Sequence, residues 1–583
     1  MRFWNRPLAQ AALVSAAVLS LGLWGIGWLL PSRAHLAWTL PPGLDTPSFH
    51  AELQESWKRM HAALGENLML ASQEATSFQG LQSAPGGWTK PPAILLNPIR
   101  SFYLRSAHDD EQTFLLLFAK MKPRQLDFRP RMYLYGGGYL YPLGAWMGGS
   151  TLLGLGRLSR DLTDYFARPE GLAGLYLSGR LFSLAMMLFG ALYLMALARR
   201  LGLTGSAPLL AGLVYALSPG VLVQAHVMKQ HTLWPLGLLA CFHACLLLLE
   251  EGRMRRWAAA GAAAGLAAGT FSVAVYAGLL PAAAAVLRLR RGERWSGELK
   301  GLLLAAGAAA AAFFAVNPYW LADLPGVRAE LAVQAGYSTL SPAALARFLA
   351  VPMRLALTWP FELAAFAGAW LALRAADDRR RLLGAAFLLS LLPALYTAAS
   401  VQSRGIRYVL ASVAFGALLC ALSWERLRAA RAQTARVLAG AALLHLALSA
   451  ANVCANFAAA DGPASTHRRA GLWLEEHVRP GESVGLWELP RPANSPYFRL
   501  DRFPLVFLDY RDAEKLPPSA LPDWIVVPQM QVFRRPEALA VLKSYGKAAD
   551  FEPAPLLPWL GIHPTATTAN PSFTVYRRQG RAS

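Results

Sequence analysis

Three consecutive carboxylates, Asp109, Asp110 and Glu111, stand directly ahead of a short apolar run at residues 112–121. Long apolar segments lie on both sides of this stretch, so we expect the acids at the edge of a membrane, facing water. A carboxylate held there can take a proton from an attacking hydroxyl and act as a general base. The simpler alternative is an acidic helix start that complements the helix dipole.

Four tyrosines follow the acids and are candidates for substrate binding. Tyr133, Tyr135, Tyr139 and Tyr141 flank the glycines at 136–138. Tyrosine offers an apolar face and a polar tip, which suits a floor for a sugar or an isoprenoid. An aromatic belt around a tight turn would give the same pattern. The glycines are not a dinucleotide fingerprint, because no strand-to-helix turn surrounds them.

Basic residues at the predicted outer ends of apolar spans are candidates for binding a phosphate. Arg180 lies near the end of one span, and Arg404 and Arg407 lie at the start of another. An arginine can hold a phosphodiester through two hydrogen bonds and stabilise the charge that grows as it leaves. Arginines that merely anchor a span at the membrane interface are the alternative.

Lys229 is the fourth basic candidate and lies between His226 and His231. The five-residue spacing of the histidines is not a zinc signature, so we predict no metal site there. Lys229 is suited to contact a phosphate, and an ordinary solvated lysine is the alternative.

The composition indicates what kind of chain positions these residues. It has 583 residues, 55% of them hydrophobic and only 16% charged, whereas soluble domains carry about 25% charged residues. The net charge of +21 comes from arginines in short loops between apolar spans, so topology explains it better than nucleic-acid binding. The four cysteines fall in or at the ends of apolar spans and predict neither disulfides nor zinc.

The pattern predicts an α fold, a polytopic transmembrane bundle of about 11 spans. The expected spans are residues 8–30, 174–198, 205–223, 232–250, 257–271, 274–289, 300–317, 351–373, 382–399, 408–424 and 435–455. Every second loop is rich in arginine, as the positive-inside rule requires, provided that the apolar stretch 257–289 is split near Thr270 to Val273. The N-terminus is then cytoplasmic and the C-terminus lies outside.

The chain is predicted to form two domains, and both have parts outside the membrane spans. Residues 1–458 form the transmembrane domain, whose first outer loop, 31–173, carries the acids and surface helices. Within that loop we expect a helix from Thr46-Pro47 to Leu64, a loop at 72–98, and a surface helix at 112–121 with Asp109 as its N-cap and Gln112 completing a capping box. Residues 459–583 read as a small soluble α/β domain, with strands at 483–487, 524–527 and 573–576 and helices at 466–478 and 536–545.

This layout resembles the GT-C-type membrane glycosyltransferases, in particular the protein O-mannosyltransferase and lipid A aminoarabinose-transferase branch. In that family an Asp followed by Glu or Asp opens the first surface helix, and its first acid is the catalytic base. Asp110-Glu111 matches this motif, with Asp109 as the alternate register. Residues 129–142 are similar to the family's basic, proline-bearing stretch that leads into a tyrosine-rich turn.

Two further segments are similar to family motifs. The family segment that corresponds to Arg180 also begins with an arginine. Residues 407–410 resemble an Arg-Tyr-x-Leu-Pro segment whose arginine faces the lipid phosphate, although Ala411 replaces the proline. A lysine that many relatives carry in the fifth span is missing from residues 265–274, and the insertion at 31–104 is longer than the family leads us to expect.

The resemblance implies an inverting glycosyltransferase of the inner membrane with its active site on the outer face. The donor would be a polyprenyl-phosphate-linked sugar and the acceptor a lipid, glycan or protein. Asp110 would be the base, and Glu111 would position the acceptor or orient Asp110. No cofactor is expected, although Asp109 and Glu111 suit a divalent ion. A lipid or saccharide transporter and a non-catalytic envelope scaffold are the alternatives, and a transporter should carry acids inside its spans.

Overall fold

The computed structural model describes most of the chain. The described residues are 6–63, 80–84, 86, 88, 90–336, 346, 349–393, 405–509, 515–528, 536–554, 556 and 569–579. Internal contacts divide the chain into a helical unit, made of Met1–Trp24, Lys120–Trp146 and Gly179–Cys454, and a mixed unit, made of Gly25–Ala119, Met147–Ser178 and Ala455–Ser583. These boundaries differ from the predicted one at 458 because residues of the first outer loop pack with the C-terminal sheet.

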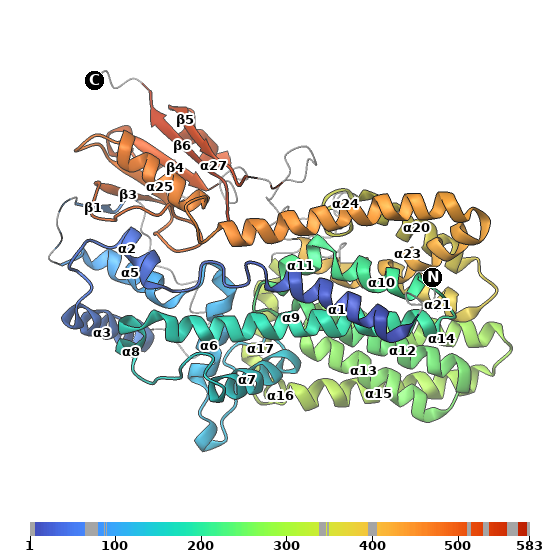
Figure 1. The fold of residues 1–583 in the computed structure, drawn as a ribbon. Coiled ribbons are helices and arrows are strands. Elements are labelled where there is room, and N and C mark those ends of the chain that lie inside the picture. The colour runs from blue at the N-terminus through green and yellow to red at the C-terminus, as the bar shows by residue number, and fades with distance from the viewer. Residues whose placement is uncertain are drawn as a thin grey trace. The chain divides into compact units, whose positions relative to one another are not determined.

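The helical unit consists of helices joined by short turns (Figure 1). Its helices are α1 (Pro7–Leu23), α7 (Gly137–Leu152), α9 (Pro169–Arg200), α10 (Ala207–Ala216), α11 (Pro219–Ala225), α12 (Trp234–Glu251), α13 (Met254–Thr270), α14 (Leu279–Arg290), α15 (Trp295–Val316), α16 (Tyr319–Ala322), α17 (Leu324–Gly336), α19 (Arg354–Leu357), α20 (Trp359–Leu373), α21 (Asp378–Leu389), α23 (Leu410–Ala430) and α24 (Ala432–Ala459). Its 3₁₀ helices are η2 (Pro123–Gln125), η3 (Gln230–Thr232), η4 (Ser272–Gly278) and η6 (Gly405–Tyr408), and η5 (Leu349–Met353) is a short π-helix. Helices α7, α9 and α24 continue into the mixed unit.

These helices make the chain a multi-pass membrane protein. Within the described residues, six helices are long and apolar enough to cross a bilayer, and two bent pairs, α10 with α11 and Val351–Leu357 with α20, raise the number to eight. Every predicted span overlaps helical residues, but the predicted spans 205–223 and 351–373 are bent pairs of helices, and the count of 11 is not confirmed. Helices α1 and α13 have 17 residues each, about 26 Å at 1.5 Å per residue, and the predicted span at 382–399 runs beyond the described residues.

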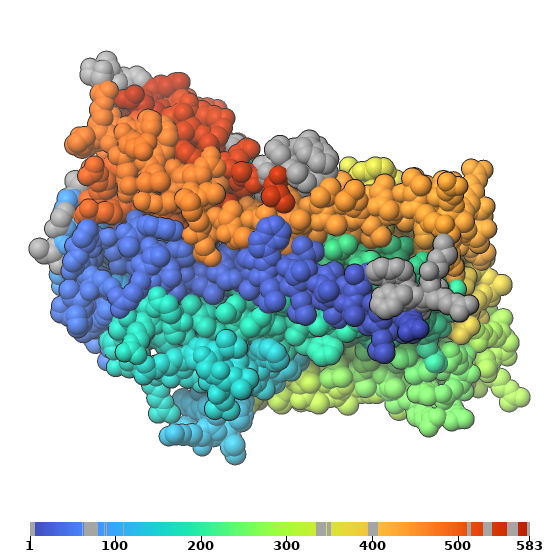
Figure 2. All heavy atoms as spheres, in the orientation of Figure 1, coloured from blue at the N-terminus to red at the C-terminus, as the bar shows by residue number. Residues whose placement is uncertain are grey.

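Several helices expose apolar side chains, as contact with lipid requires. Helices α1 and α24 lie on the face of the protein drawn in Figure 2. Leu8 on α1 and Val437 on α24 are both exposed, as are Leu303 on α15 and Leu363 on α20. In water such surfaces would be costly, so these helices fit a hydrocarbon surrounding.

The helix break predicted near Thr270 is present and divides the long apolar stretch into two helices. Helix α13 ends at Thr270, and Phe271 is extended, with φ −150° and ψ 117°. The turn η4 follows and leads into α14. The extended residue forms an isolated antiparallel bridge with Tyr135, one of the four candidate tyrosines. The break in the helix therefore positions that tyrosine.

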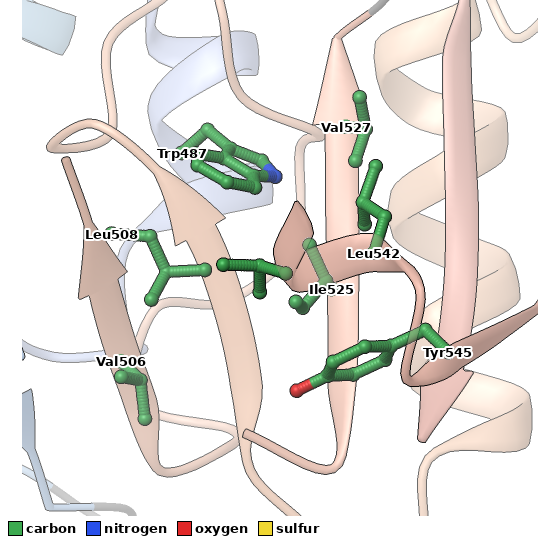
Figure 3. Close-up of a cluster of buried hydrophobic side chains, with 8 residues drawn as sticks. Trp487, Val506, Leu508, Ile525, Val527, Leu542 and Tyr545 are labelled. Carbon is green, nitrogen blue, oxygen red and sulfur yellow. The ribbon is translucent and has the colours of Figure 1, made fainter. Parts of the chain in front are cut away.

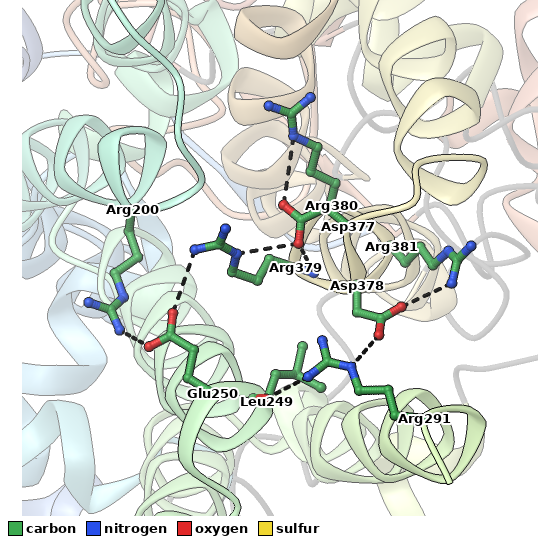
Figure 4. Close-up of polar contacts among 9 residues, drawn as sticks. All are labelled: Arg200, Leu249, Glu250, Arg291, Asp377, Asp378, Arg379, Arg380 and Arg381. Carbon is green, nitrogen blue, oxygen red and sulfur yellow. Dashed lines mark hydrogen bonds and ion pairs between the residues drawn. The ribbon is translucent and has the colours of Figure 1, made fainter.

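Arginines of the predicted cytoplasmic loops meet at one end of the helical unit (Figure 4). Glu250 at the end of α12 pairs with Arg200 of α9 and lies 3.8 Å from Arg379. Asp378, at the start of α21, pairs with Arg291 at 2.6 Å. These loops therefore lie together, as the alternation of arginine-rich loops predicts, while the membrane side that they face stays a prediction.

The mixed unit contains a six-stranded sheet in the order β1-β3-β2-β4-β6-β5. Its strands are β1 (Gln82–Ser83), β2 (Val484–Trp487), β3 (Leu505–Leu508), β4 (Trp524–Pro528), β5 (Tyr545–Phe551) and β6 (Phe573–Arg578), and its helices are α2 (Arg33–Thr39), α3 (Pro47–Ala63), α5 (Ala93–Leu104), α6 (Asp109–Lys120), α8 (Leu162–Ala167), α25 (Thr466–His477), α27 (Pro536–Leu542) and the turn η8 (Pro518–Ala520). Strands β3, β2 and β4 are parallel, and the other neighbours pair antiparallel. The parallel strands are fully buried, as expected of strands covered on both faces.

One face of this sheet packs against α27 (Figure 3). The buried cluster comprises Trp487, Val506, Leu508, Ile525, Val527, Val541, Leu542 and Tyr545. The tyrosine hydroxyl donates to Pro522 O at 2.6 Å, which satisfies its polar end. The predicted strands β2, β4 and β6 and helices α25 and α27 are confirmed, whereas β3 and β5 were not predicted.

The predicted loop at 72–98 is wrong in part. Residues 82–83 form β1, which pairs with β3 at the edge of the sheet, and α5 begins at Ala93. Composition alone misses both, because a two-residue edge strand is specified by its partner and α5 carries an internal proline, Pro98.

His467 on α25 makes the stability of the mixed unit dependent on pH. Its ring stacks on Tyr497 with centroids 4.7 Å apart, and its Nδ1 lies 2.7 Å from Ser495 O. Burial lowers the pKa of His467 to about 4. The unfolded chain binds the proton below its ordinary pKa near 6.5, so stability is complete above that pH and falls as the pH drops toward 4. From pH 7.5 to pH 5 we expect a loss of about 2 kcal/mol, measured as a lower unfolding temperature of the purified chain.

A matched pair of variants isolates this histidine. His467→Gln should flatten the pH dependence between pH 7.5 and 5, whereas His477→Gln, at the exposed end of the same helix, should keep it. An equal pH dependence in His467→Gln and the unchanged protein would contradict the assignment.

Candidate active site

The bridge between Tyr135 and Phe271 is the centre of the candidate site in the helical unit. Tyr135 is the residue before the glycine triplet, and Phe271 is the extended residue between α13 and η4. Residues that pair in a bridge point their side chains to the same side of the backbone. Both side chains are buried, so the bridge holds two aromatic rings on one side of the joined segments.

The three glycines allow this close approach. A Cβ at Gly136 would lie 2.0 Å from Gly269 O, and one at Gly137 would lie 1.9 Å from Val316 O. The backbone of the loop therefore lies directly against the ends of α13 and α15. None of the three glycines has a positive φ, and Gly137 and Gly138 already belong to α7, so close packing explains the glycines here.

Asn317 fixes the loop to both helix ends. Its Oδ1 accepts from Gly137 N at 2.8 Å, and its Nδ2 donates to Gly269 O at 3.2 Å. The side chain is buried. One amide thus joins α7, α13 and α15, and a change at this residue would release Tyr135.

Two acids of the outer segment after α15 hold the next part of the loop. The Tyr133 hydroxyl donates to Asp323 Oδ2 at 2.7 Å, while Glu330 Oε2 accepts from the backbone N–H groups of Tyr133 and Leu134 at 2.8 and 3.0 Å. Burial, followed by the hydrogen bond to Asp323, raises the pKa of Tyr133 well above its ordinary value. Its phenol therefore stays protonated and donates at any physiological pH.

Three of the four candidate tyrosines line a common pocket. Tyr133, Tyr135 and Tyr141 do so together with Pro130, Gly137, Asn317, Tyr319 and Trp320. Tyr139 is placed elsewhere, fully buried in α7 with its ring 5.9 Å from that of Phe182. Five of the eight residues that line the pocket are aromatic: Tyr133, Tyr135, Tyr141, Tyr319 and Trp320.

Lys229 and Arg407 lie at opposite ends of a series of aromatic contacts. The Lys229 ammonium lies 5.9 Å from the centroid of the Tyr135 ring, and the Arg407 guanidinium lies 4.8 Å from that of Tyr408. Phe271 joins the two ends, because it pairs with Tyr135 and stacks on Tyr408 with centroids 6.1 Å apart. Two cations from distant parts of the sequence thus share one cluster, which we name the Phe271 cluster: Tyr135, Lys229, His231, Trp234, Phe271, Arg407 and Tyr408.

Both cations are held in partly dry surroundings. Lys229 is only 3% exposed, so it is not the solvated lysine that was the simpler alternative. Arg407 is half-buried on η6, and its Nε has no hydrogen-bond partner among the described residues. Buried cations of this kind attract an anionic ligand more strongly than exposed ones, because the surroundings screen the charge less.

The turn that carries Lys229 also holds unpaired polar atoms. Gln230 Oε1, Thr232 Oγ1 and Trp234 Nε1 are shielded from solvent and have no hydrogen-bond partner in the described part of the chain. Each such group costs about 1–3 kcal/mol. Three in one turn therefore mark a place where the fold is not optimised for its own stability.

Arg180 and His226 lie in a neighbouring buried position. Arg180 is fully buried on α9, so it is not an exposed interfacial anchor. The ring nitrogens of His226 lie 2.8 Å from Leu222 O and 3.0 Å from Trp24 O, so the histidine joins α11 to the end of α1. Within the described residues no group of histidines, cysteines and acids has the arrangement of a metal site.

The candidate acids belong to the mixed unit and open α6. His108 Nδ1 accepts from Asp110 N at 3.3 Å, so His108 is the N-cap, and the predicted cap at Asp109 is one residue too late. Glu111 is fully buried and accepts from Ser106 Oγ at 2.5 Å. Asp110 is partly exposed at the second position of the helix, where the helix dipole favours a carboxylate.

Two predicted site residues are not placed. Arg404 and the side chain of Asp109 lie outside the described residues. Two basic residues between Asp109 and the tyrosines make contacts of their own. Arg131 pairs with Asp127 at 2.8 Å, and the Arg129 guanidinium lies 5.9 Å from the centroid of the Tyr319 ring.

Sequence reasoning missed Phe271, Asn317, Asp323 and Glu330. A faint signal existed for Phe271, because the span boundary had to fall beside it. Asn317, Asp323 and Glu330 lie in the segment between the predicted spans 300–317 and 351–373, where no motif marks them. Their roles depend on which backbone groups the fold brings to them, and spacing along the chain does not reveal that.

No protein-family model and no curated protein matches the chain. Solved structures are similar to it, among them the following three. The archaeal oligosaccharyltransferase AglB from Archaeoglobus fulgidus, in complex with an inhibitory peptide and a dolichol-phosphate, is 12% identical over 72% of this chain and 65% of its own, with a TM-score of 0.41. ArnT from Cupriavidus metallidurans, bound to undecaprenyl phosphate, is 13% identical over 70% and 84%, with a TM-score of 0.34. The arabinofuranosyltransferase AftD from Mycobacteria is 17% identical over 76% and 37%, with a TM-score of 0.35.

All three are GT-C glycosyltransferases, the class that the sequence resembles. The chain covers 65% of the length of AglB, and all three TM-scores lie below 0.5. The likeness therefore names no donor, acceptor or catalytic residue for this chain, and the functional argument rests on its own residues.

The packing of the glycine triplet is open to a direct test. Gly137→Ala forces a Cβ against Val316 O, so we expect the free energy of unfolding to fall by about 1–3 kcal/mol. Gly148→Ala, on the same helix with nothing within 4 Å of its Cβ, should leave the stability unchanged or raise it by up to about 1 kcal/mol. Thermal unfolding of both purified variants measures the difference, and equal unfolding temperatures would rule out the close contact.

Proposed function

We propose that this protein is a membrane glycosyltransferase that moves a sugar from a polyprenyl-phosphate donor to an acceptor at the outer face of the cell's inner membrane. The observation that carries the proposal is the Phe271 cluster, in which Lys229 and Arg407 flank a set of aromatic rings. A glycosyl phosphate needs this combination, because its phosphate is anionic and its sugar offers apolar faces to aromatic rings.

The proposed reaction is a single displacement. An oxygen or nitrogen of the acceptor attacks the anomeric carbon, the bond from that carbon to the phosphate oxygen breaks, and the configuration inverts. The acceptor's proton passes to the Asp110 carboxylate, and the polyprenyl phosphate leaves with the bonding electrons. Arg407 and Lys229 stabilise the charge that grows on that phosphate, the contribution that usually lowers such barriers most.

Three features of α6 support Asp110 as the base. Asp110 is a partly exposed residue, unlike the buried Glu111. His108 caps its backbone N–H, which fixes the start of the helix. Glu111 is buried and held by Ser106, so it orients the helix start, and its carboxylate is turned away from bulk solvent.

The role of Asp110 is tested with a matched acid. Asp110→Asn should lower the release of polyprenyl phosphate from purified protein by about 100-fold or more, because the base is removed and the shape is kept. Asp161→Asn is the control: Asp161 caps α8 by accepting from Thr163 N at 2.9 Å, and asparagine caps equally well. Turnover by Asp110→Asn equal to that of the control would remove Asp110 as the base.

The phosphate site is tested by removing each cation. Arg407→Ala should lower kcat/KM for the lipid-linked donor by about 100-fold, and Lys229→Met by about tenfold or more, because each withdraws a charged hydrogen-bond donor from the leaving group. Arg160→Ala, an exposed arginine of the outer loop, is the control. An unchanged kcat/KM in Arg407→Ala would show that this residue does not bind the lipid phosphate.

A further inference from the structure

The turn between α11 and α12, together with the first residue of α12, carries polar side chains that the fold shields from water and leaves unpaired among the described residues. They are Gln230 Oε1, Thr232 Oγ1 and Trp234 Nε1, within five successive residues. Within the described chain this is the turn that also supplies Lys229 to the Phe271 cluster. A fold keeps unpaired groups of this kind where a bound partner satisfies them.

The same turn is part of an aromatic surface. The rings of His231 and Trp234 lie 5.4 and 5.8 Å from that of Phe271. His231 belongs to η3 and Trp234 opens α12, and both rings contact that of Phe271. The unpaired indole N–H of Trp234 therefore lies at the edge of the ring set that joins Tyr135 to Tyr408.

The unpaired atoms indicate the chemistry of their ligand. The indole N–H donates, the hydroxyl of Thr232 both donates and accepts, and the amide oxygen of Gln230 accepts. A phosphate only accepts and cannot satisfy an amide carbonyl. Sugar hydroxyl groups do both, and the faces of a sugar ring pack on aromatic side chains.

We propose that Gln230, Thr232 and Trp234 bind the hydroxyl groups of the donor's sugar and determine which sugar is transferred. This assignment rests on the proposed glycosyltransferase function and adds a sugar subsite to it. Lys229, directly before these residues, and Arg407, beyond Phe271, then hold the phosphate that is bonded to the same sugar. Gln230, Thr232 and Trp234 thus bind the sugar that is transferred, whereas Lys229 and Arg407 bind the phosphate that leaves.

Binding requires the turn to move, because the three atoms are shielded from solvent. The turn is held by backbone bonds from Lys229 N to Val227 O at 2.9 Å and from Leu233 N to Gln230 O at 3.1 Å. A three-residue 3₁₀ turn has poorer hydrogen-bond geometry than an α-helix, so it shifts at lower cost than the helices on either side.

The experiment compares two probes on the full chain in detergent: undecaprenyl phosphate, and undecaprenyl phosphate linked to each of a panel of pentoses, hexoses and aminosugars. The unchanged protein should bind at least one sugar-linked lipid more tightly than the sugar-free lipid. Thr232→Val and Trp234→Phe should each weaken binding of that lipid by about fivefold to tenfold, the worth of one hydrogen bond, and leave the Kd for undecaprenyl phosphate within about twofold.

Matched variants separate recognition from folding. Thr232→Val removes an unpaired hydroxyl without changing the shape, so the unfolding temperature should not fall. Thr232→Ser keeps the hydroxyl and should restore the preference for the sugar-linked lipid. Thr39→Val, at a buried threonine whose hydroxyl already donates within its own helix, should change neither Kd.

The outcomes distinguish this proposal from the one on which it rests. If Thr232→Val and Trp234→Phe change the two Kd values equally, or change neither, the sugar subsite is wrong while the glycosyltransferase proposal stands. If the unchanged protein prefers no sugar-linked lipid, the subsite is equally overturned. If it binds neither kind of lipid, both proposals fall.

Discussion

The arrangement of the helical unit depends on one backbone contact, the bridge between Tyr135 and Phe271. It forms only because α13 stops at Thr270 and because glycine at 136 and 137 lets the loop reach the helix ends. Asn317 then closes the junction through hydrogen bonds to Gly137 and Gly269. In a membrane each of these exposed backbone groups would be costly if unpaired. The broken helix is therefore tolerated only where another segment satisfies it, and that segment is the tyrosine-bearing loop.

The distribution of charge separates the two ends of the helical unit. At one end arginines meet acids in pairs, as between Arg291 and Asp378, and the charges largely cancel. At the other end Lys229 and Arg407 lie over aromatic rings. A ring attracts a cation without neutralising it. The first arrangement holds loops together, and the second suits binding of an anion.

The sequence predicted the helices well and the contacts between them poorly. Apolar length placed the helices, and the alternation of arginine-rich loops required the break beside Phe271, while the number of membrane spans is not confirmed. Strands β2, β4 and β6 were readable because they are apolar and end at turn residues. Strand β1 and residues such as Asn317 and Glu330 were not, since their roles depend on partners far away in sequence. The burial of Lys229 was not predicted, because burial of a lysine cannot be read from its neighbours along the chain.

The pairing of β1 with β3 has a consequence for biosynthesis. Gly80 N donates to Phe507 O, and Phe507 N donates to Leu81 O. The edge strand β1 therefore comes from the early part of the chain, and its partner β3 comes from the late part. During translation the early strand must wait, unpaired, until nearly all membrane helices have been inserted. Contacts this distant in sequence form slowly, and an unpaired segment is exposed to proteases and to association with other chains in the meantime. Correct maturation of this protein is therefore coupled to completion of its last residues, and a truncated chain would carry an open edge where the full-length chain has a closed one.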